Sequence, residues 1–234
     1  MATTKTKSRL NGSATHLAEV DPPEVGQAVA ITAPNLKTVA FKITGTSPYV
    51  QNKFSAKAKE MMKATQEAVS VAKKGKKKTA KDFKQCYEDA QYKPAGETWP
   101  FGAIPATAFK AAMVSACRLV DFKMTDAKQC VYIEADGYDG DERVPLIRIT
   151  KGKPEYFEQV VRLPNGTADI RVRPMWQPGW EAIVRITYDA DRFNLSDVSN
   201  LLMRAGTQVG IGEGRAASRM CVGLGWGAFT LAVK

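Results

Sequence analysis

The chain has 234 residues, of which 44% are hydrophobic and 25% are charged. This composition is ordinary for a soluble globular protein, and the length is sufficient to bury a sizeable core. No apolar run approaches the roughly 18 residues that cross a bilayer, and the N-terminus lacks the apolar core of a signal peptide. We therefore expect a cytoplasmic protein with no membrane partner.

Charge and residue chemistry narrow the function further. The formal net charge is +10, which favours a polyanionic partner such as nucleic acid. The cysteines, Cys86, Cys117, Cys130 and Cys221, are far apart and form no CxxC pair, so we predict reduced thiols and no zinc site. The one histidine, His16, lies in a segment without a packing pattern. We expect no histidine-based catalysis, no metal and no cofactor.

The first predicted element is a strand at 37–44. Its Val39, Phe41 and Ile43 alternate with small or polar residues, which gives the strand one buried face. The preceding residues 1–30 are small, polar and rich in breakers, so they predict a flexible basic arm. The strand ends at the loop TGTSPYVQNKFS, whose glycine and proline break the ladder.

A helix and a lysine-rich segment follow. Ser55 is a suitable N-cap for a helix that runs to about Val71. The predicted inner side of this helix consists of Met61, Met62, Thr65 and Val69. A lysine-rich insertion at about 72–84 comes next, before a short helix at 80–90. Such a run is typical of a solvated loop. The functional alternative is a flap that closes over a phosphate backbone through Lys73, Lys74, Lys76, Lys77 and Lys78.

A helix is predicted after WPFGAI, with Pro105 in its first turn, where a missing N–H does no harm. Its apolar stripe consists of Phe109, Ala112, Met113, Ala116 and Val120. Strands at 129–135 and 144–150 flank the acidic turn EADGYDGDE. Strands at 168–173 and 181–188 are predicted to form a hairpin through the connection RPMWQPGW.

The last helix is capped by Asn194 and is expected to end at Gly206. Its inward residues are Leu195, Val198, Leu201, Leu202 and Ala205. A strand at 228–233 closes the chain. This order of elements suits an α+β protein, an antiparallel sheet with helices on one side, in a single domain at 31–234.

The most informative segment is Gly206 to Gly227, which holds seven of the eighteen glycines. Its GxGxG at 210–214 follows a helix and precedes a strand, and no Walker lysine is present, which excludes both nucleotide-binding fingerprints. Two interpretations remain, a tight structural turn and a nest of N–H groups that meets phosphates. The candidate binding residues are Gly210, Gly212, Gly214, Arg215 and Arg219.

The loop after the first strand offers similar chemistry. Its candidate binding residues are Ser47, Gln51, Asn52 and Lys53, which can contact phosphates or sugars. Tyr49 and Phe54 can stack on bases, worth about 1–3 kcal/mol each, or can pack beneath the loop.

The strand at 168–173 places Arg171 and Arg173 on one face, with Trp176 and Trp180 near the tip of the predicted hairpin. Arginine and tryptophan together can form a platform for single-stranded nucleic acid, or a subunit contact. The acidic residues Asp136, Asp139, Asp141 and Glu142 lack the spacing of a calcium loop. We interpret them as a solvated turn, with metal-dependent phosphodiester cleavage as a minor alternative.

Two segments resemble the RAMP superfamily of RNA-binding proteins from CRISPR effector complexes. KTVAFKITGTSPYVQNKFS resembles the first strand and loop of that superfamily, and GIGEGRAASRMCVGLGWGAF resembles its glycine-rich loop and final strand. The resemblance implies an RRM/ferredoxin-like sheet with inserted loops. It also implies binding along a single strand, with head-to-tail assembly. The glycine loop of the family maps to Gly210, Gly212, Gly214, Gly223, Gly225 and Gly227.

Together these features predict a non-enzymatic protein that binds RNA or single-stranded DNA along its backbone, largely without sequence preference. We expect an oligomer, a filament or a larger nucleoprotein assembly. The chain also suits a relative from a phage or mobile element, which would act in the host cytoplasm. The alternative is a structural or assembly protein, such as a virion component, that uses the same loops for subunit contacts.

Overall fold

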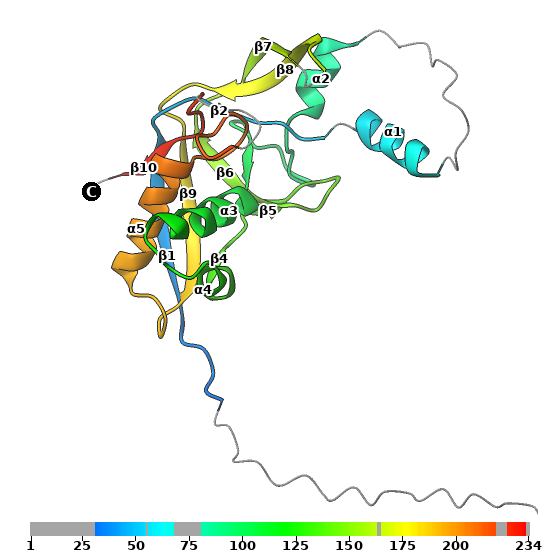
Figure 1. Cartoon of the computed structure of the whole chain (residues 1–234). Helices are drawn as coiled ribbons and strands as arrows, with labels where there is room; N and C mark the ends of the chain where they lie inside the picture. The colour runs from blue at the N-terminus through cyan, green and yellow to red at the C-terminus, as the bar shows by residue number, and fades with distance from the viewer. Residues whose placement is uncertain (1–30, 55, 68–80, 163–164, 219–223, 233–234) are drawn as a thin grey trace, which may run out of the picture. The chain divides into compact units, whose positions relative to one another are not determined.

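The structure is a computed structural model of the chain, and it describes residues 31–54, 56–67, 81–162, 165–218 and 224–232 (Figure 1). The predicted N-terminal arm, Val69, and the candidate residues Lys73, Lys74, Lys76, Lys77, Lys78 and Arg219 lie outside these ranges. The fold described below belongs to the unit Pro34–Lys234.

The main sheet has the strand order β10-β1-β9-β6-β3, with β4 paired to β9 and β5 paired to β6. All of these pairings are antiparallel. The strands are β1 (Leu36–Gly45), β3 (Ala103–Pro105), β4 (Val131–Ile133), β5 (Gly137–Tyr138), β6 (Pro145–Lys151), β9 (Glu181–Asp189) and β10 (Phe229–Leu231). The long central pair runs from Leu36 opposite Asp189 to Thr44 opposite Glu181.

Helices α3 (Ala106–Ala116) and α5 (Leu195–Arg204) lie together against one face of this sheet (Figure 1). Each connects two strands of the sheet, α3 after β1 and α5 between β9 and β10. With β1 and β9 central and β10 at the edge beside β1, this is the ferredoxin-like order of a split βαβ unit. The predicted α+β class is therefore confirmed.

Local sequence explains why these elements form. Ile43 of β1 is fully buried, and Val39 and Phe41 pack against the same core, as their alternation predicts. Helix α5 begins with a capping box, in which Asn194 accepts from the Asp197 N–H and Asp197 accepts from the Asn194 N–H. Its buried side consists of Val198, Leu201 and Leu202.

A second, three-stranded sheet has the order β2-β8-β7. Its strands are β2 (Tyr49–Val50), β7 (Glu155–Arg162) and β8 (Ala168–Trp176). Helix α2 (Phe83–Asp89) packs against β8. The predicted β8–β9 hairpin is therefore wrong, since β8 pairs with β2 and β7 while β9 belongs to the main sheet.

The tryptophans explain this difference. Trp176 and Trp180 are both 0% exposed, and each ring packs on Tyr49, with centroids 5.2 and 5.7 Å apart. Their indole N–H groups donate to the carbonyls of Phe101 and Ser47. The two tryptophans thus anchor the chain in the core on either side of the exposed residues Gln177 and Pro178. Neither tryptophan forms an exposed platform or subunit contact, because both rings are covered.

Three helix predictions also need correction. Helix α5 does not end at Gly206 but continues as a π-helical turn, Ala205–Val209, to Gly210, whose φ is 75°. Met61 and Met62 of α1 (Ala56–Glu67) are 61% and 52% exposed, because this lysine-rich helix has no apolar stripe to bury. The stripe of α3 ends before Val120, which is 42% exposed, because the chain leaves α3 through a 3₁₀ turn, Cys117–Leu119.

Several elements were not predicted, among them the short strands β2, β3 and β5. Helix α4 (Met124–Cys130) occupies the start of the expected strand at 129–135, so that β4 begins only at Val131. Strand β7 lies in a segment for which no element was predicted. Pro105 lies at the N-cap of α3 and also ends β3. Among the described cysteines, Cys86, Cys117 and Cys130 are free thiols.

Candidate functional site

The glycine loop, residues 210–218 and 224–227, lies directly against the loop that follows β1. The Gly227 N–H donates to the Pro48 carbonyl at 2.6 Å, and the Glu213 N–H donates to the Val50 carbonyl at 2.9 Å. The loop also closes on itself, since the Ile211 N–H donates to the Gly227 carbonyl at 3.0 Å. The two segments that carry the RAMP resemblance are thus joined in space by backbone hydrogen bonds.

Glycine is required where these two loops touch. Gly212 has a φ of 76°, and a Cβ there would lie 2.5 Å from the Val50 carbonyl oxygen. Gly227 has a φ of 69°, and a Cβ there would overlap the Ile211 carbonyl. A side chain at either position would face both an unfavourable backbone conformation and a clash. These contacts support the tight-turn interpretation of the loop.

A groove of about 1290 Å³ opens beside the glycine loop. Its walls include α3, the glycine loop, residues 159–162 of β7 with Arg171 of β8, and the residues after β2. Small residues of α3, such as Ala108, Ala111 and Ser115, form one wall. The aromatic side chains on its lining include Phe54, Tyr92 and Trp226. This groove is the candidate functional site.

The charged residues that line the groove are Arg162, Arg171, Arg215 and Glu213, three cations and one anion. Arg215 is exposed, and its Nη1 donates to the Gly212 carbonyl at 3.0 Å. Arg162, at the exposed end of β7, was not predicted, because no element had been assigned to that segment. The lining therefore carries a positive excess, as a site for a polyanion requires.

The predicted arginines Arg171 and Arg173 are both engaged by Glu213. Arg173 Nε lies 2.7 Å from Glu213 Oε2, and Arg171 Nη1 lies 3.6 Å from Glu213 Oε1. Arg171 Nε also lies 4.0 Å from Asp169. The three-stranded sheet is held against the glycine loop by these ion pairs and by the edge-on contact of Phe157 with Trp226.

Of the four predicted residues after β1, only Asn52 is exposed and lines the groove without a buried role. Gln51 is 2% exposed; its amide donates to Tyr49 Oη and the Ala103 carbonyl and accepts from the Tyr92 N–H. Ser47 Oγ accepts from the Ala228 N–H at 2.8 Å. Internal partners therefore already use polar groups of Gln51 and Ser47, and their role in binding stays a prediction.

Lys53 is also engaged by partners inside the protein. Its Nζ lies 2.9 Å from both carboxylate oxygens of Asp139 and 2.8 Å from Asp141, and its side chain is 5% exposed. Burial opposes the charged form, but the ion pairs with Asp141 and Asp139 raise the pKa of Lys53 above its ordinary value. The charge of this lysine is therefore used inside the protein.

The acidic turn is not fully solvated either. Asp139 is 0% exposed and accepts from the N–H groups of Lys93, Asp141 and Glu142. Burial opposes ionisation, but these N–H groups and Lys53 hold the pKa of Asp139 below its ordinary value. Within the described residues, no cluster of His, Cys, Asp or Glu is arranged to hold a metal ion. Asp139 organises this turn around Lys53.

Tyr49 and Phe54, the two aromatic residues predicted to stack on bases, differ in their exposure. Tyr49 is 1% exposed, and burial raises the pKa of its hydroxyl well above the ordinary value. Phe54 is 66% exposed and lines the groove. Trp226, half-buried on the glycine loop, is a further aromatic residue of the groove that was not predicted to bind.

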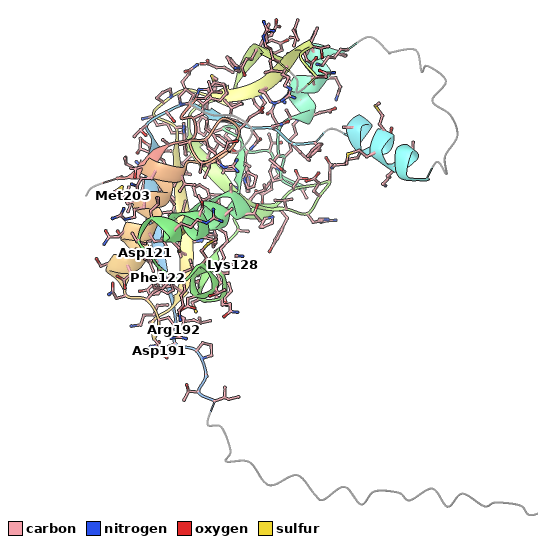
Figure 2. The ribbon with its side chains drawn as sticks, in the orientation of Figure 1. Asp121, Phe122, Lys128, Asp191, Arg192 and Met203 are labelled. Atoms are coloured by element: carbon pink, nitrogen blue, oxygen red, sulfur yellow. The ribbon has the colours of Figure 1, made fainter. Side chains whose placement is uncertain are left out.

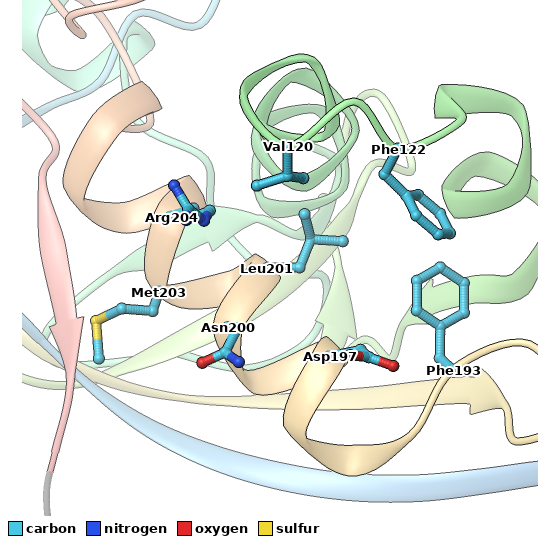
Figure 3. Close-up of a pocket in the computed structure, with 8 residues that line it drawn as sticks. All are labelled: Val120, Phe122, Phe193, Asp197, Asn200, Leu201, Met203 and Arg204. Carbon is cyan, nitrogen blue, oxygen red and sulfur yellow. The ribbon is translucent and has the colours of Figure 1, made fainter.

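A smaller cavity of about 680 Å³ lies beside α5 (Figure 3). Phe122 and Phe193 face each other on its lining, with ring centroids 5.1 Å apart. Asp121, which precedes Phe122, has a φ of 51° (Figure 2). Val120 and Leu201 add to its apolar lining. None of the predicted binding residues within the described ranges lines this cavity.

No family model and no curated protein matches the chain. Among solved structures, the chain is similar to the crystal structure of Cmr6 from Pyrococcus furiosus. The identity is 10%, the match covers 84% of this chain and 99% of that chain, and the TM-score is 0.41. None of the helices in the described ranges combines the length and apolarity needed to cross a membrane. Membership of the RAMP superfamily stays a prediction from the sequence.

Proposed function

We propose that this protein is a RAMP-like, non-enzymatic protein that binds single-stranded nucleic acid in the groove, largely without sequence preference. One observation carries the proposal. The two segments that carry the RAMP resemblance are far apart in sequence, yet they are hydrogen-bonded into one wall of a groove that also presents Arg162, Arg171 and Arg215.

The binding chemistry follows from this lining. Guanidinium groups bind phosphate oxygens through paired N–H donors, so Arg162 and Arg215 would follow the backbone of the strand. Phe54 and Trp226 would stack on bases, a contact that tolerates any sequence. The small side chains of α3 leave room in the groove for the nucleic-acid strand. Phosphate contacts of this kind make affinity fall steeply as salt rises.

The test is a salt titration of binding to fluorescent RNA and single-stranded DNA of equal length. Arg162→Gln should weaken binding and make the slope of log K against log salt shallower by about 0.7. Arg192→Gln is the matched control, because Arg192 is exposed in the turn between β9 and α5, away from the groove lining (Figure 2). Absence of salt-dependent binding to either polymer would sink the proposal.

The lysines of the insertion, Lys73, Lys74, Lys76, Lys77 and Lys78, are proposed to add phosphate contacts as a flap. Their joint replacement by serine should weaken binding and flatten the salt dependence further, with the oligomeric state unchanged. Unchanged binding would contradict the flap, and the lysines would then contribute only to the solubility of the protein.

A second candidate function, a structural or assembly role, is favoured by exposed apolar side chains on the lining of the smaller cavity and on residues next to that lining in the sequence. Val120 and Phe122 of the lining are 42% and 38% exposed, and Leu119 and Leu195 are each 51% exposed. Contiguous exposed apolar side chains are typical of interaction surfaces. Sedimentation of the purified protein with and without nucleic acid separates the two functions, because assembly without nucleic acid would favour the second.

A further inference from the structure

Glu213 stands in the groove among the arginines that the proposed function needs. It lies between Gly212 and Gly214, both with positive φ, and its N–H is tied to the Val50 carbonyl. Its side chain is 26% exposed and reaches Arg171 and Arg173 on β8. A carboxylate at this position opposes the approach of a phosphate backbone.

The two arginines are held unequally. Arg173 is 15% exposed, and its Nε contacts Glu213 Oε2 at 2.7 Å, which is a full charge-assisted hydrogen bond. Arg171 is 35% exposed, lines the groove, and lies 3.6 Å from Glu213 Oε1, too far for a hydrogen bond. Arg173 therefore anchors the glutamate, while Arg171 is held by two longer ion pairs, to Glu213 and to Asp169, and can exchange the first of them for a phosphate.

We infer that Glu213 is an internal competitor for phosphate, which occupies Arg171 in the free protein and lowers the affinity of the groove for nucleic acid. This inference rests on the proposed function. A carboxylate and a phosphate bind a guanidinium group in the same paired geometry, so a phosphate must displace Glu213 to engage Arg171 fully. Glu213 thereby sets how tightly, and with how many phosphate contacts, the strand is held.

The backbone position of Glu213 does not depend on its charge. The glycine loop is fixed by the N–H groups of Ile211, Glu213 and Gly227, none of which involves the carboxylate. In Glu213→Gln the amide oxygen can still accept from Arg173 Nε. The substitution therefore removes the competing charge and leaves the loop in place.

Glu213→Gln should bind a fluorescent single-stranded oligonucleotide about two- to fivefold more tightly than the wild type at low salt, the range expected for a partly exposed ion pair. The salt dependence should steepen by about 0.7, because one more phosphate contact is made. Glu158→Gln is the control for the change in net charge, since Glu158 is exposed and is not among the residues that line the groove.

The double variant Glu213→Gln/Arg171→Ala identifies the arginine that is released. The gain should be lost in this background, because Arg171 is the group set free. An equal gain with and without Arg171 overturns the inference, as does a Glu213→Gln affinity no higher than that of Glu158→Gln. Failure of the wild type to bind any single strand overturns the proposed function instead. Thermal melting of each variant verifies that the fold is kept.

Discussion

Lys53 and Asp139 show how a single buried pair organises the acidic turn. Removing the lysine charge would leave Asp139, which is 0% exposed, without its cation, and an uncompensated buried charge destabilises strongly. We predict that Lys53→Met lowers the free energy of unfolding by about 3–5 kcal/mol at neutral pH, measured by urea denaturation. Lys93→Met, which breaks the exposed pair with Glu88, is the control and should change it by less than about 1 kcal/mol.

The pH dependence of this effect has a definite sign. The pKa of Asp139 is depressed in the folded state below its ordinary 3.8, so its stabilisation is present above that value and is lost as pH falls below it. The pKa of Lys53 is raised above its ordinary 10.5, so its contribution is lost only as pH rises beyond that value. The wild type should therefore lose this stabilisation in acid, below about pH 4. A Lys53→Met variant no less stable than Lys93→Met at pH 7 would contradict this account.

At the scale of elements, the stability of the fold depends on the close contact between the glycine loop and strand β2. Gly212→Ala places a Cβ against the Val50 carbonyl at a φ of 76°, so both the backbone conformation and the packing oppose it. Gly166→Ala is a matched control, because its φ is 82° but nothing lies within 4 Å of the added atom. We predict a loss of about 1–2 kcal/mol for Gly166→Ala, from conformation alone, and a larger loss for Gly212→Ala, together with weaker binding of nucleic acid. Equal losses would show that the loop contact is not close-packed.

The element scale also shows what the sequence could and could not predict. Alternation in β1 and the cap at Asn194 are local signals, and both elements form where they were expected. The pairing of β8 is not local: its neighbours in the chain suggested a hairpin with β9, whereas burial of Trp176 and Trp180 drives the strands into separate sheets. Lys53 is hidden for a similar reason, since its partner Asp139 lies 86 residues away and no local pattern marks it.

At the scale of the whole molecule, a net charge of +10 attracts a polyanion to any surface, so the groove must be distinguished from the rest. The uncovered face of the main sheet is the obvious rival. On that face the central strands β1 and β9 carry no aromatic side chain, and their cations are paired. Lys42 lies 2.8 Å from Glu181, and Arg185 lies 2.7 Å from Asp136. Because the cations of this face are already paired with carboxylates, they are less available to bind a phosphate.

This contrast gives the last prediction. Arg215→Gln in the groove and Lys42→Gln on the sheet face each remove one positive charge, so both leave the same net charge. At physiological salt, where screening acts beyond about 8 Å, only the charge beside the bound strand should matter. We expect Arg215→Gln to weaken binding and flatten the salt dependence by about 0.7, while Lys42→Gln leaves both unchanged. Equal effects of the two variants would mean that binding follows the total charge of the protein, which would contradict binding in the groove.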